Sequence, residues 1–286
     1  MKNRSKNWVV FSNQNLTEKC RILYDRYMNN QRSAAFLDID GCLTPGKNRM
    51  VHRHNLWMIQ ETLESLSPNF EYIIVTARPA PYAEAVMQFL GLFSEDSFRH
   101  AICESGGVTH LFGSNDYSNA SEVNPVGLIE LEGNLRAVET KFNFKLEDGR
   151  KRTICLIPTE GTSSDLASAV CQIIPQTFDL HLSVGGVDIV PAGMDKSKAI
   201  LELARRHNIN LQSAIAIGDS SSDLKMLALV GSPACPINAN SQVKKMVSSR
   251  CGYISNFESV NGVADILRHF AFCRQANDPM LAVDCC

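Results

Sequence analysis

Short apolar runs alternate with segments of helical periodicity along most of this chain. Strands are expected at 34–40, 72–76, 100–104, 214–218, 234–237 and 252–254. Helices are expected at 56–66, 82–92, 196–207, 223–230, 242–249 and 260–272. Because such alternation favours parallel strands joined by crossover helices, the pattern predicts an α/β protein with a doubly wound, Rossmann-like parallel sheet.

The third quarter of the chain follows a different pattern. Its elements are expected, in order, as a helix at 128–142, a strand at 153–158, a helix at 164–174 and two strands within 179–190. Gly185 and Gly186 separate the last two strands, as in the turn of an antiparallel hairpin. This quarter therefore predicts a small α+β cap domain inserted into the parallel core.

These patterns divide the sequence into four parts. The expected division is an N-terminal extension at 1–31, a first core part at 32–115, the cap at 116–190 and a second core part at 191–286. The extension contains one candidate amphipathic helix at 16–27. Its composition does not distinguish docking on the core from a role in dimerisation, so monomer and homodimer both stay open.

Composition narrows the class of protein. The formal net charge is −2, which gives no electrostatic reason to bind nucleic acid or an anionic membrane. No apolar run reaches the ~20 residues of a membrane span, and the basic amino terminus lacks the apolar core of a signal peptide. The ten cysteines form no Cys-x-x-Cys pair, which indicates reduced thiols. We expect a cytoplasmic enzyme.

Two aspartates end the first apolar run. Asp38 and Asp40 lie two residues apart in the segment Asp-Ile-Asp-Gly, and Gly41 allows a tight turn there. Close carboxylates suit a nucleophile paired with a proton carrier, and they equally suit Mg²⁺, which prefers oxygen ligands. Taken alone, the segment is as compatible with an ordinary turn that contains aspartates as it is with a catalytic or metal site.

A second acidic segment follows the strand expected at 214–218. Asp219 lies at its tip and is placed to complete a magnesium site with Asp38. Asp223 falls near the first turn of the next helix, where a carboxylate also acts as a simple cap.

Two further strand and helix ends offer partners for a phosphate group. Thr76 ends the strand at 72–76, and its hydroxyl and the following backbone amide, at Ala77, are potential donors to a phosphate oxygen. Lys196 opens a helix, where an ammonium group is well placed to hold an anion, with Lys198 as a rival. Neither Thr76 nor Lys196 indicates a phosphate site by itself. Each does so only together with the other candidate residues.

Together, the four segments resemble the motifs of the haloacid-dehalogenase superfamily of phosphatases. Asp38 and Asp40 match the first motif, Thr76 the second, Lys196 the third, and Asp219 with Asp223 the fourth. The segments at 102–107 and 187–191 resemble the Cof-type and sugar-phosphatase branch, whose larger cap lies between the second and third motifs.

The resemblance implies a two-step phosphoryl transfer. Asp38 is the implied nucleophile, which forms an aspartyl-phosphate, and Asp40 the implied acid and base. Phosphate binding is implied for Thr76, Ala77 and Lys196. The implied Mg²⁺ ligands are Asp38, Asp40, Asp219 and Asp223.

Other positions depart from the family pattern or have a weaker claim. Ser105 and Ser222 replace asparagines usual in the family, and Cys42 replaces a small hydroxylated or branched residue. Arg78 is a candidate for substrate contact or a structural ion pair. On the cap, polar residues that could face the substrate are Arg152, Thr153, His181 and Ser183.

The expected function is hydrolysis of a small phosphorylated metabolite, with a sugar phosphate as the expected substrate. A phosphomutase on the same scaffold is the alternative, because the same cap branch contains both activities. A weakly active binding or regulatory protein is a further alternative, although the acids whose loss would mark such a protein, including Asp38 and Asp40, are all present.

Overall fold

The computed structural model describes residues 33–45, 50–67, 69–92, 100–111, 116–119, 125–183 and 185–275. The extension at 1–31, with its expected helix at 16–27, lies outside the described residues. None of the helices in the described ranges is long and apolar enough to cross a membrane.

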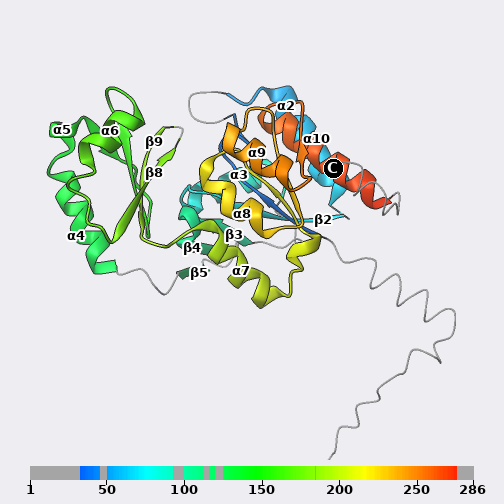
Figure 1. Ribbon diagram of the computed structural model, residues 1–286, viewed down its shortest axis with the longest axis horizontal. Helices are drawn as coiled ribbons and strands as arrows, with labels where there is room; N and C mark the ends of the chain where they lie inside the picture. The colour runs from blue at the N-terminus through cyan, green and yellow to red at the C-terminus, as the bar shows by residue number, and fades with distance from the viewer. Residues whose placement is uncertain are drawn as a thin grey trace, which may run out of the picture. The chain divides into compact units, whose positions relative to one another are not determined.

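The larger sheet of the described residues has the order β12-β11-β10-β1-β2-β3-β4-β5. Its strands are β1 (Ser33–Leu37), β2 (Phe70–Val75), β3 (His100–Cys103), β4 (Val108–Leu111), β5 (Asp116–Asn119), β10 (Ile215–Ile217), β11 (Ser232–Cys235) and β12 (Tyr253–Ile254). The six strands from β12 to β3 are parallel. Because β1 is central and the chain adds strands first on one side and then on the other, the predicted doubly wound α/β sheet is confirmed (Figure 1).

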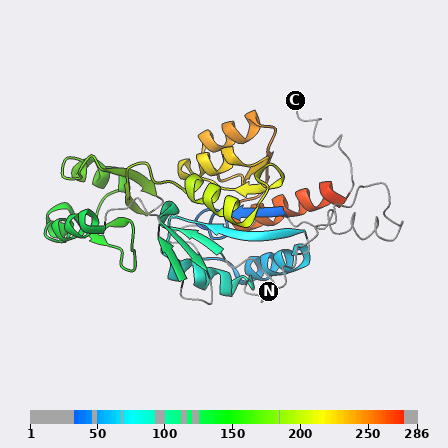
Figure 2. The same cartoon turned by 90° about the horizontal axis from the view of Figure 1, so that it is seen from below.

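Helices cover both faces of this sheet. They are α2 (Arg53–Leu66), α3 (Ala80–Phe89), α7 (Lys196–His207), α8 (Leu224–Leu229), α9 (Ser241–Ser249) and α10 (Ser259–Gln275). Alternate residues of β1 explain the two layers: Ala35 and Leu37 pack with α2, α3 and α10, whereas Ala34 and Phe36 pack with α7, α8 and α9. Figure 2 shows α7 to α9, in yellow-green to orange, on one side of the sheet and the blue helix α2 on the other.

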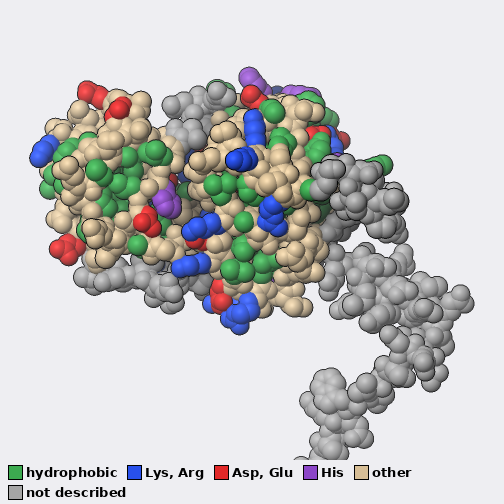
Figure 3. Space-filling view, viewed as in Figure 1, with side chains coloured by type: hydrophobic (Ala, Val, Ile, Leu, Met, Phe, Trp, Pro, Cys, Tyr) green, Lys and Arg blue, Asp and Glu red, His purple; other side chains and the backbone are tan. Residues whose placement is uncertain are grey.

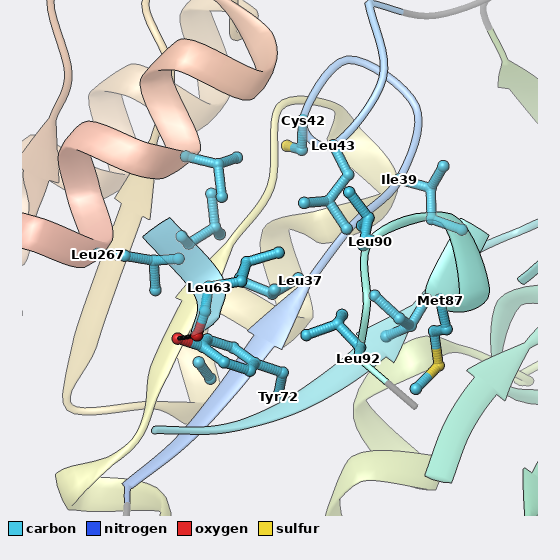
Figure 4. Packing of buried hydrophobic residues seen from close by; sticks show 14 of the residues in the cluster. Leu37, Ile39, Cys42, Leu43, Leu63, Tyr72, Met87, Leu90, Leu92 and Leu267 are labelled. Carbon is cyan, nitrogen blue, oxygen red and sulfur yellow. Dashed lines mark hydrogen bonds between the residues drawn. The ribbon is translucent and has the colours of Figure 1, made fainter. Parts of the chain in front are cut away.

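Packing in the first of these layers is dense and almost wholly apolar. Leu37, Leu63 and Met87 are essentially inaccessible to solvent, and the hydroxyl of the neighbouring Tyr72 donates to the Leu63 carbonyl (3.1 Å). Figure 4 shows these side chains converging from β1, β2, α2 and α3. This packing fixes the carboxyl ends of the parallel strands, where the candidate residues lie.

The smaller sheet is antiparallel, in the order β6-β7-β9-β8. Its strands are β6 (Phe144–Leu146), β7 (Ile154–Pro158), β8 (Phe178–Ser183) and β9 (Gly186–Pro191), and its helices are α4 (Pro125–Arg136), α5 (Glu139–Phe142) and α6 (Ser163–Val170). Leu135, Leu156 and Val170 belong to a hydrophobic core of its own. We call residues 125–191 the insert; the predicted hairpin between β8 and β9 is confirmed.

The structure corrects the expected start of this insert. We placed the boundary at Asp116, but β5 pairs antiparallel with β4, which pairs with β3, so both strands extend the larger sheet. Strands β4, β5 and β6 were not predicted from the sequence. Each is only three or four residues long, which is too short for an alternation of apolar and polar positions to be distinctive, and its pairing is decided by the neighbouring strand.

The surface charge agrees with the small net charge. On the face drawn in Figure 3, lysine and arginine side chains are scattered and lie among acidic ones instead of forming one large basic patch.

Candidate active site

Asp38 and Lys196 are the centre of a buried group of charges at the carboxyl edge of the larger sheet. Nζ of Lys196, the first residue of α7, donates to Oδ1 of Asp38 (2.7 Å) and to Oδ1 of Asp223 (2.6 Å). The three side chains are buried. They meet because β1 and β10 end in register, with the Asp38 N–H donating to the Ile217 carbonyl (3.0 Å). We call Asp38, Asp219, Asp223 and Lys196 the carboxylate cluster.

Asp223 serves as a helix cap and as an ion-pair partner at once. Its Oδ2 accepts hydrogen bonds from the backbone N–H of Asp219 (3.2 Å) and of Ser220 (3.0 Å) at the start of a 3₁₀ turn, Ser221–Asp223. The Ser220 hydroxyl also donates to Oδ2, and it contacts the Ser222 hydroxyl (2.8 Å). The Ser222 hydroxyl is therefore linked to the Asp223 carboxylate through the Ser220 hydroxyl.

The electrostatics of the carboxylate cluster are unbalanced. Burial, followed by the neighbouring Asp223 carboxylate, raises the pKa of Asp38 well above its usual range, and the same two causes raise the pKa of Asp219 to about 7. Burial alone would lower the pKa of Lys196, but Asp223 and Asp38 raise it. Three carboxylates share one ammonium group, so the cluster has an excess of negative charge when all are ionised.

The turn after β1 brings Asp219 close to the backbone. Gly41 has φ +85°, and a Cβ there would lie 2.0 Å from Oδ2 of Asp219. The side-chain amide of Asn238 donates to the Gly41 carbonyl (2.9 Å) and fixes this turn. Glycine is therefore required at this position both for the backbone conformation and for space.

The donors in this region fit a divalent cation. A carboxylate oxygen of Asp38, Sγ of Cys42 and a carboxylate oxygen of Asp219 lie within 4.8 Å of one another. Oδ1 of Asp219 is buried and has no hydrogen-bond partner among the described residues. A cation bound here would give that oxygen a partner and offset the excess negative charge.

Asp40 has partners that differ from those of Asp38. Arg78 holds its carboxylate in a bidentate ion pair, with Nε donating to Oδ2 (2.7 Å) and Nη2 to Oδ1 (2.9 Å). The hydrogen bond to Asp40 is the main reason that the pKa of Arg78 is raised. Nη1 of Arg78 donates to Oε1 of Glu147 in the insert (3.0 Å). The geometry thus gives Arg78 a fixed position beside Asp40.

The ion pairs continue into the insert. Arg150 donates from Nη2 to Oε2 of Glu147 (2.6 Å), and its Nη2 lies 3.1 Å from Oδ1 of Asp188. We call Asp40, Arg78, Glu147, Arg150 and Asp188 the arginine network. Within it, each arginine is paired with two acidic side chains.

Thr76 and Ala77 connect β2 to the arginine network. The buried Thr76 hydroxyl accepts a hydrogen bond from the Arg78 backbone N–H (3.0 Å). The Ala77 carbonyl accepts one from Nη1 of Arg150 (3.0 Å). In this state Thr76 shapes the loop, and its contact with a phosphate group stays a prediction.

Glu104 joins β3 to the insert. Its buried carboxylate accepts the backbone N–H groups of residues 151–153, at 2.7–3.0 Å. Glu104 and Ser105 both have positive φ, 50° and 56°, and the Ser105 N–H donates to the Thr76 carbonyl (3.1 Å). Ser105 is therefore placed next to the site through its backbone.

A cavity of about 40 Å³ lies beside Asp40. It is lined by Asp40, Ala77, Arg78, Arg150, Cys155, Ser183, Gly185 and Asp188. Of the four polar residues expected on the cap to face the substrate, only Ser183 lines it. Thr153 is buried instead and donates from its hydroxyl to Glu104 (3.2 Å).

Four residues that shape this region were not predicted from the sequence. They are Glu104, Glu147, Arg150 and Asn238. Glu147 and Arg150 pair with each other like ordinary charged turn residues, and the contacts that connect them to Arg78 and Ala77 span 69 and 73 positions in the sequence. Glu104 is the exception, since it falls within a segment that already resembled a family motif.

Known proteins resemble this chain in sequence and in fold. The profile of a family described as haloacid dehalogenase-like hydrolase matches residues 116–267, just over half of the chain. A phosphoglycolate phosphatase of Picrophilus torridus is 31% identical over 82% of this chain and 89% of its own length. One of Methanothrix thermoacetophila is 27% identical over 82% and 96%. A haloacid dehalogenase-like hydrolase from Bacteroides thetaiotaomicron superposes with a TM-score of 0.64, at 16% identity, over 84% of this chain and 100% of that one.

Proposed function

This chain belongs to the haloacid dehalogenase-like hydrolases and is a phosphoric monoester hydrolase, and we propose that it dephosphorylates a small metabolite in two steps through Asp38. The observation that carries the proposal is the ammonium group of Lys196, which bridges Asp38 and Asp223 inside a buried cluster. An ammonium in this position both orients the nucleophilic carboxylate and offsets the charge of an incoming phosphate dianion.

A divalent cation, proposed to be Mg²⁺, would be held by Asp38 and Asp219, with the Asp40 carbonyl as a further oxygen donor. When bound, it supplies electrostatic stabilisation to the phosphate oxygens. Asp223 acts through its contacts with Lys196 and with the Asp219 backbone, because its carboxylate oxygens are already engaged there. The sequence prediction of Asp223 as a direct ligand is thus replaced in this proposal by a positioning role.

The chemistry uses the two aspartates in turn. An oxygen of Asp38 attacks phosphorus, and the bond to the leaving oxygen breaks. Asp40, after one of its oxygens has separated from Arg78 and taken up a proton from solvent, supplies the proton that the leaving alkoxide takes up. Asp40 then accepts a proton from the water that hydrolyses the aspartyl-phosphate. Arg78 holds the Asp40 carboxylate in place, and the donors proposed for the phosphate are Thr76, the Ala77 amide and Lys196.

The cavity beside Asp40 is small, with a volume of about 40 Å³, so it favours a small leaving group. Its lining contains two arginines, Arg78 and Arg150, and two aspartates, Asp40 and Asp188, so its charge does not select an anion. Two relatives aligned over most of their length are phosphoglycolate phosphatases, which supports a short phosphorylated acid as substrate. The sugar phosphate expected from the sequence remains the second candidate, with Ser183 and Asp188 as partners for its hydroxyl groups.

The test is phosphate release by the purified protein with Mg²⁺ across phosphoglycolate, sugar phosphates and p-nitrophenyl phosphate. We expect magnesium-dependent turnover that is lost in Asp38→Asn and highest with the short acid. Turnover of a sugar phosphate alone would favour the second candidate. Phosphate appearing on a second sugar position instead of in solution would indicate a mutase. No release from any compound, with a folded protein, would favour a binding protein.

A further inference from the structure

Cys42 lies at the candidate cation site. It follows Gly41 in the turn after β1, and its side chain is fully buried. Figure 4 shows Cys42 at the end of the apolar cluster, with its sulfur directed away from Leu43. That sulfur belongs to the group of three potential ligand atoms, with Asp38 and Asp219, that lie within 4.8 Å of one another.

A second observation points to a ligand at the same place. Asp219 is 9% exposed, and its buried Oδ1 has no hydrogen-bond partner in the part of the chain that the structure describes. A buried carboxylate oxygen without a partner is costly unless a cation or a donor reaches it. The thiol therefore lies beside a carboxylate that has one buried oxygen without a hydrogen-bond partner among the described residues.

The spacing suits a cation that accepts sulfur. Zinc binds thiolate sulfur at about 2.3 Å and carboxylate oxygen at about 2.0–2.2 Å, so at the tetrahedral angle these two donors of one ion lie about 3.6 Å apart. The three potential ligand atoms lie within 4.8 Å of one another, so they must move closer together when an ion binds. Magnesium, by contrast, takes oxygen ligands and gains little from a sulfur atom.

We propose that Cys42 is a third protein donor at this site, which therefore binds thiophilic divalent cations such as Zn²⁺ and Cd²⁺ in competition with Mg²⁺. On binding, the metal–sulfur bond replaces the S–H bond and the proton passes to the solvent, with no change of oxidation state. This inference rests on the proposed function only through the shared cation site. It makes the expected phosphatase sensitive to traces of soft metals.

Cadmium binding to the whole protein tests the proposal without measuring catalysis. The protein, freed of metal with EDTA and dialysed without oxygen, is titrated with Cd²⁺ while the ultraviolet thiolate-to-cadmium charge-transfer absorption is recorded. Wild type is compared with Cys42→Ser and with Cys103→Ser, which removes another buried thiol. Asp219→Asn tests whether the cadmium shares the carboxylate site.

We expect Cys42→Ser and Asp219→Asn to weaken cadmium binding at least about tenfold, by analogy with losses seen at metal sites, whereas Cys103→Ser binds as wild type does. Excess Mg²⁺ should suppress the wild-type absorption. A cadmium signal that is unchanged in Cys42→Ser, or that is unchanged in Asp219→Asn, would overturn the proposal. If Cys42→Ser does not fold, Asp219→Asn remains the decisive variant, because it changes the same site and leaves every thiol in place. A protein that binds cadmium through Cys42 but hydrolyses no phosphate ester would retain this inference and refute the proposed function.

Discussion

The carboxylate cluster and the arginine network each contain one aspartate of the Asp-Ile-Asp segment, Asp38 and Asp40 respectively, yet they balance charge differently. In the cluster, Lys196 alone faces three buried carboxylates. In the network, Arg78 and Arg150 are paired with Asp40, Glu147 and Asp188, so each positive group has acidic partners on both sides.

This difference separates two kinds of function. The cluster is electrostatically incomplete and is suited to receive a cation and to perform chemistry. The network satisfies most of its own charges and links Asp40 to the insert, so it is suited to positioning. Substitutions in the cluster should therefore change both activity and stability strongly. Substitutions in the network should change catalysis more than stability.

Loss of the nucleophile should have the largest effect. Asp38→Asn is expected to lower kcat on the order of 10⁶-fold, because catalytic groups that act as a unit lose nearly all their contribution together. Phosphate release measured beside Asp148→Asn, whose side chain is 91% exposed, checks this. Retention of activity within tenfold of wild type would exclude Asp38 as the nucleophile.

Removal of the single ammonium group should break the cluster. Lys196→Met is expected to lower the free energy of unfolding by about 3–5 kcal/mol, because it leaves buried carboxylates without a counter-charge. Urea unfolding in EDTA measures the change, and Lys198→Met, at an exposed position of the same helix, is the control. Equal stability of the two variants would show that Lys196 does not hold the cluster together.

Loosening the arginine network should affect catalysis more than folding. Arg78→Met is expected to lower kcat/KM about 10²-fold, since small displacements of a catalytic group have effects of that size. Steady-state kinetics of Arg78→Met, Glu147→Gln and the double variant should show non-additive losses. Arg205→Met, which removes a surface ion pair with Glu202, should leave kcat/KM unchanged. Additive effects would mean that Arg78 and Glu147 act independently.

The smallest expected effect is a pH dependence of stability in metal-free protein. The pKa of Asp219 is raised to about 7 from an ordinary value of 3.8, so between these values the folded state binds more protons than the unfolded state. Stability should therefore fall as pH rises from about 4 to 7, by about 1 kcal/mol or more. Urea unfolding across this range tests it.

The variant Asp219→Asn and added Mg²⁺ test whether Asp219 causes this pH dependence of stability. Asp219→Asn should flatten the slope because the titrating group is gone, and added Mg²⁺ should raise stability most at the higher pH. A slope that persists in Asp219→Asn would assign the dependence to other groups, such as Asp38, whose pKa is also raised.

The contacts of each region could be predicted from the sequence only where the signal is local to a short segment. The strand tips that place Asp38, Thr76 and Asp219 were predictable, because apolar runs that end in polar residues are a local signal. The pairing of Asp40 with Arg78 spans 38 positions, and the bond from Arg78 to Glu147 spans 69. Neither contact leaves a pattern in the chain.

The sequence by itself determined the parallel α/β core, the order of its main elements and the acidic residues at its strand ends. Those features depend on periodicity and on residue chemistry, which are properties of short segments. Only the tertiary structure decided that β4 and β5 extend the larger sheet, that Arg78 and Arg150 form one network with acids of the insert, and that Cys42 lies beside Asp219. Such pairings are set by which surfaces meet on folding, and the energy of each contact depends on partners that are distant in the chain.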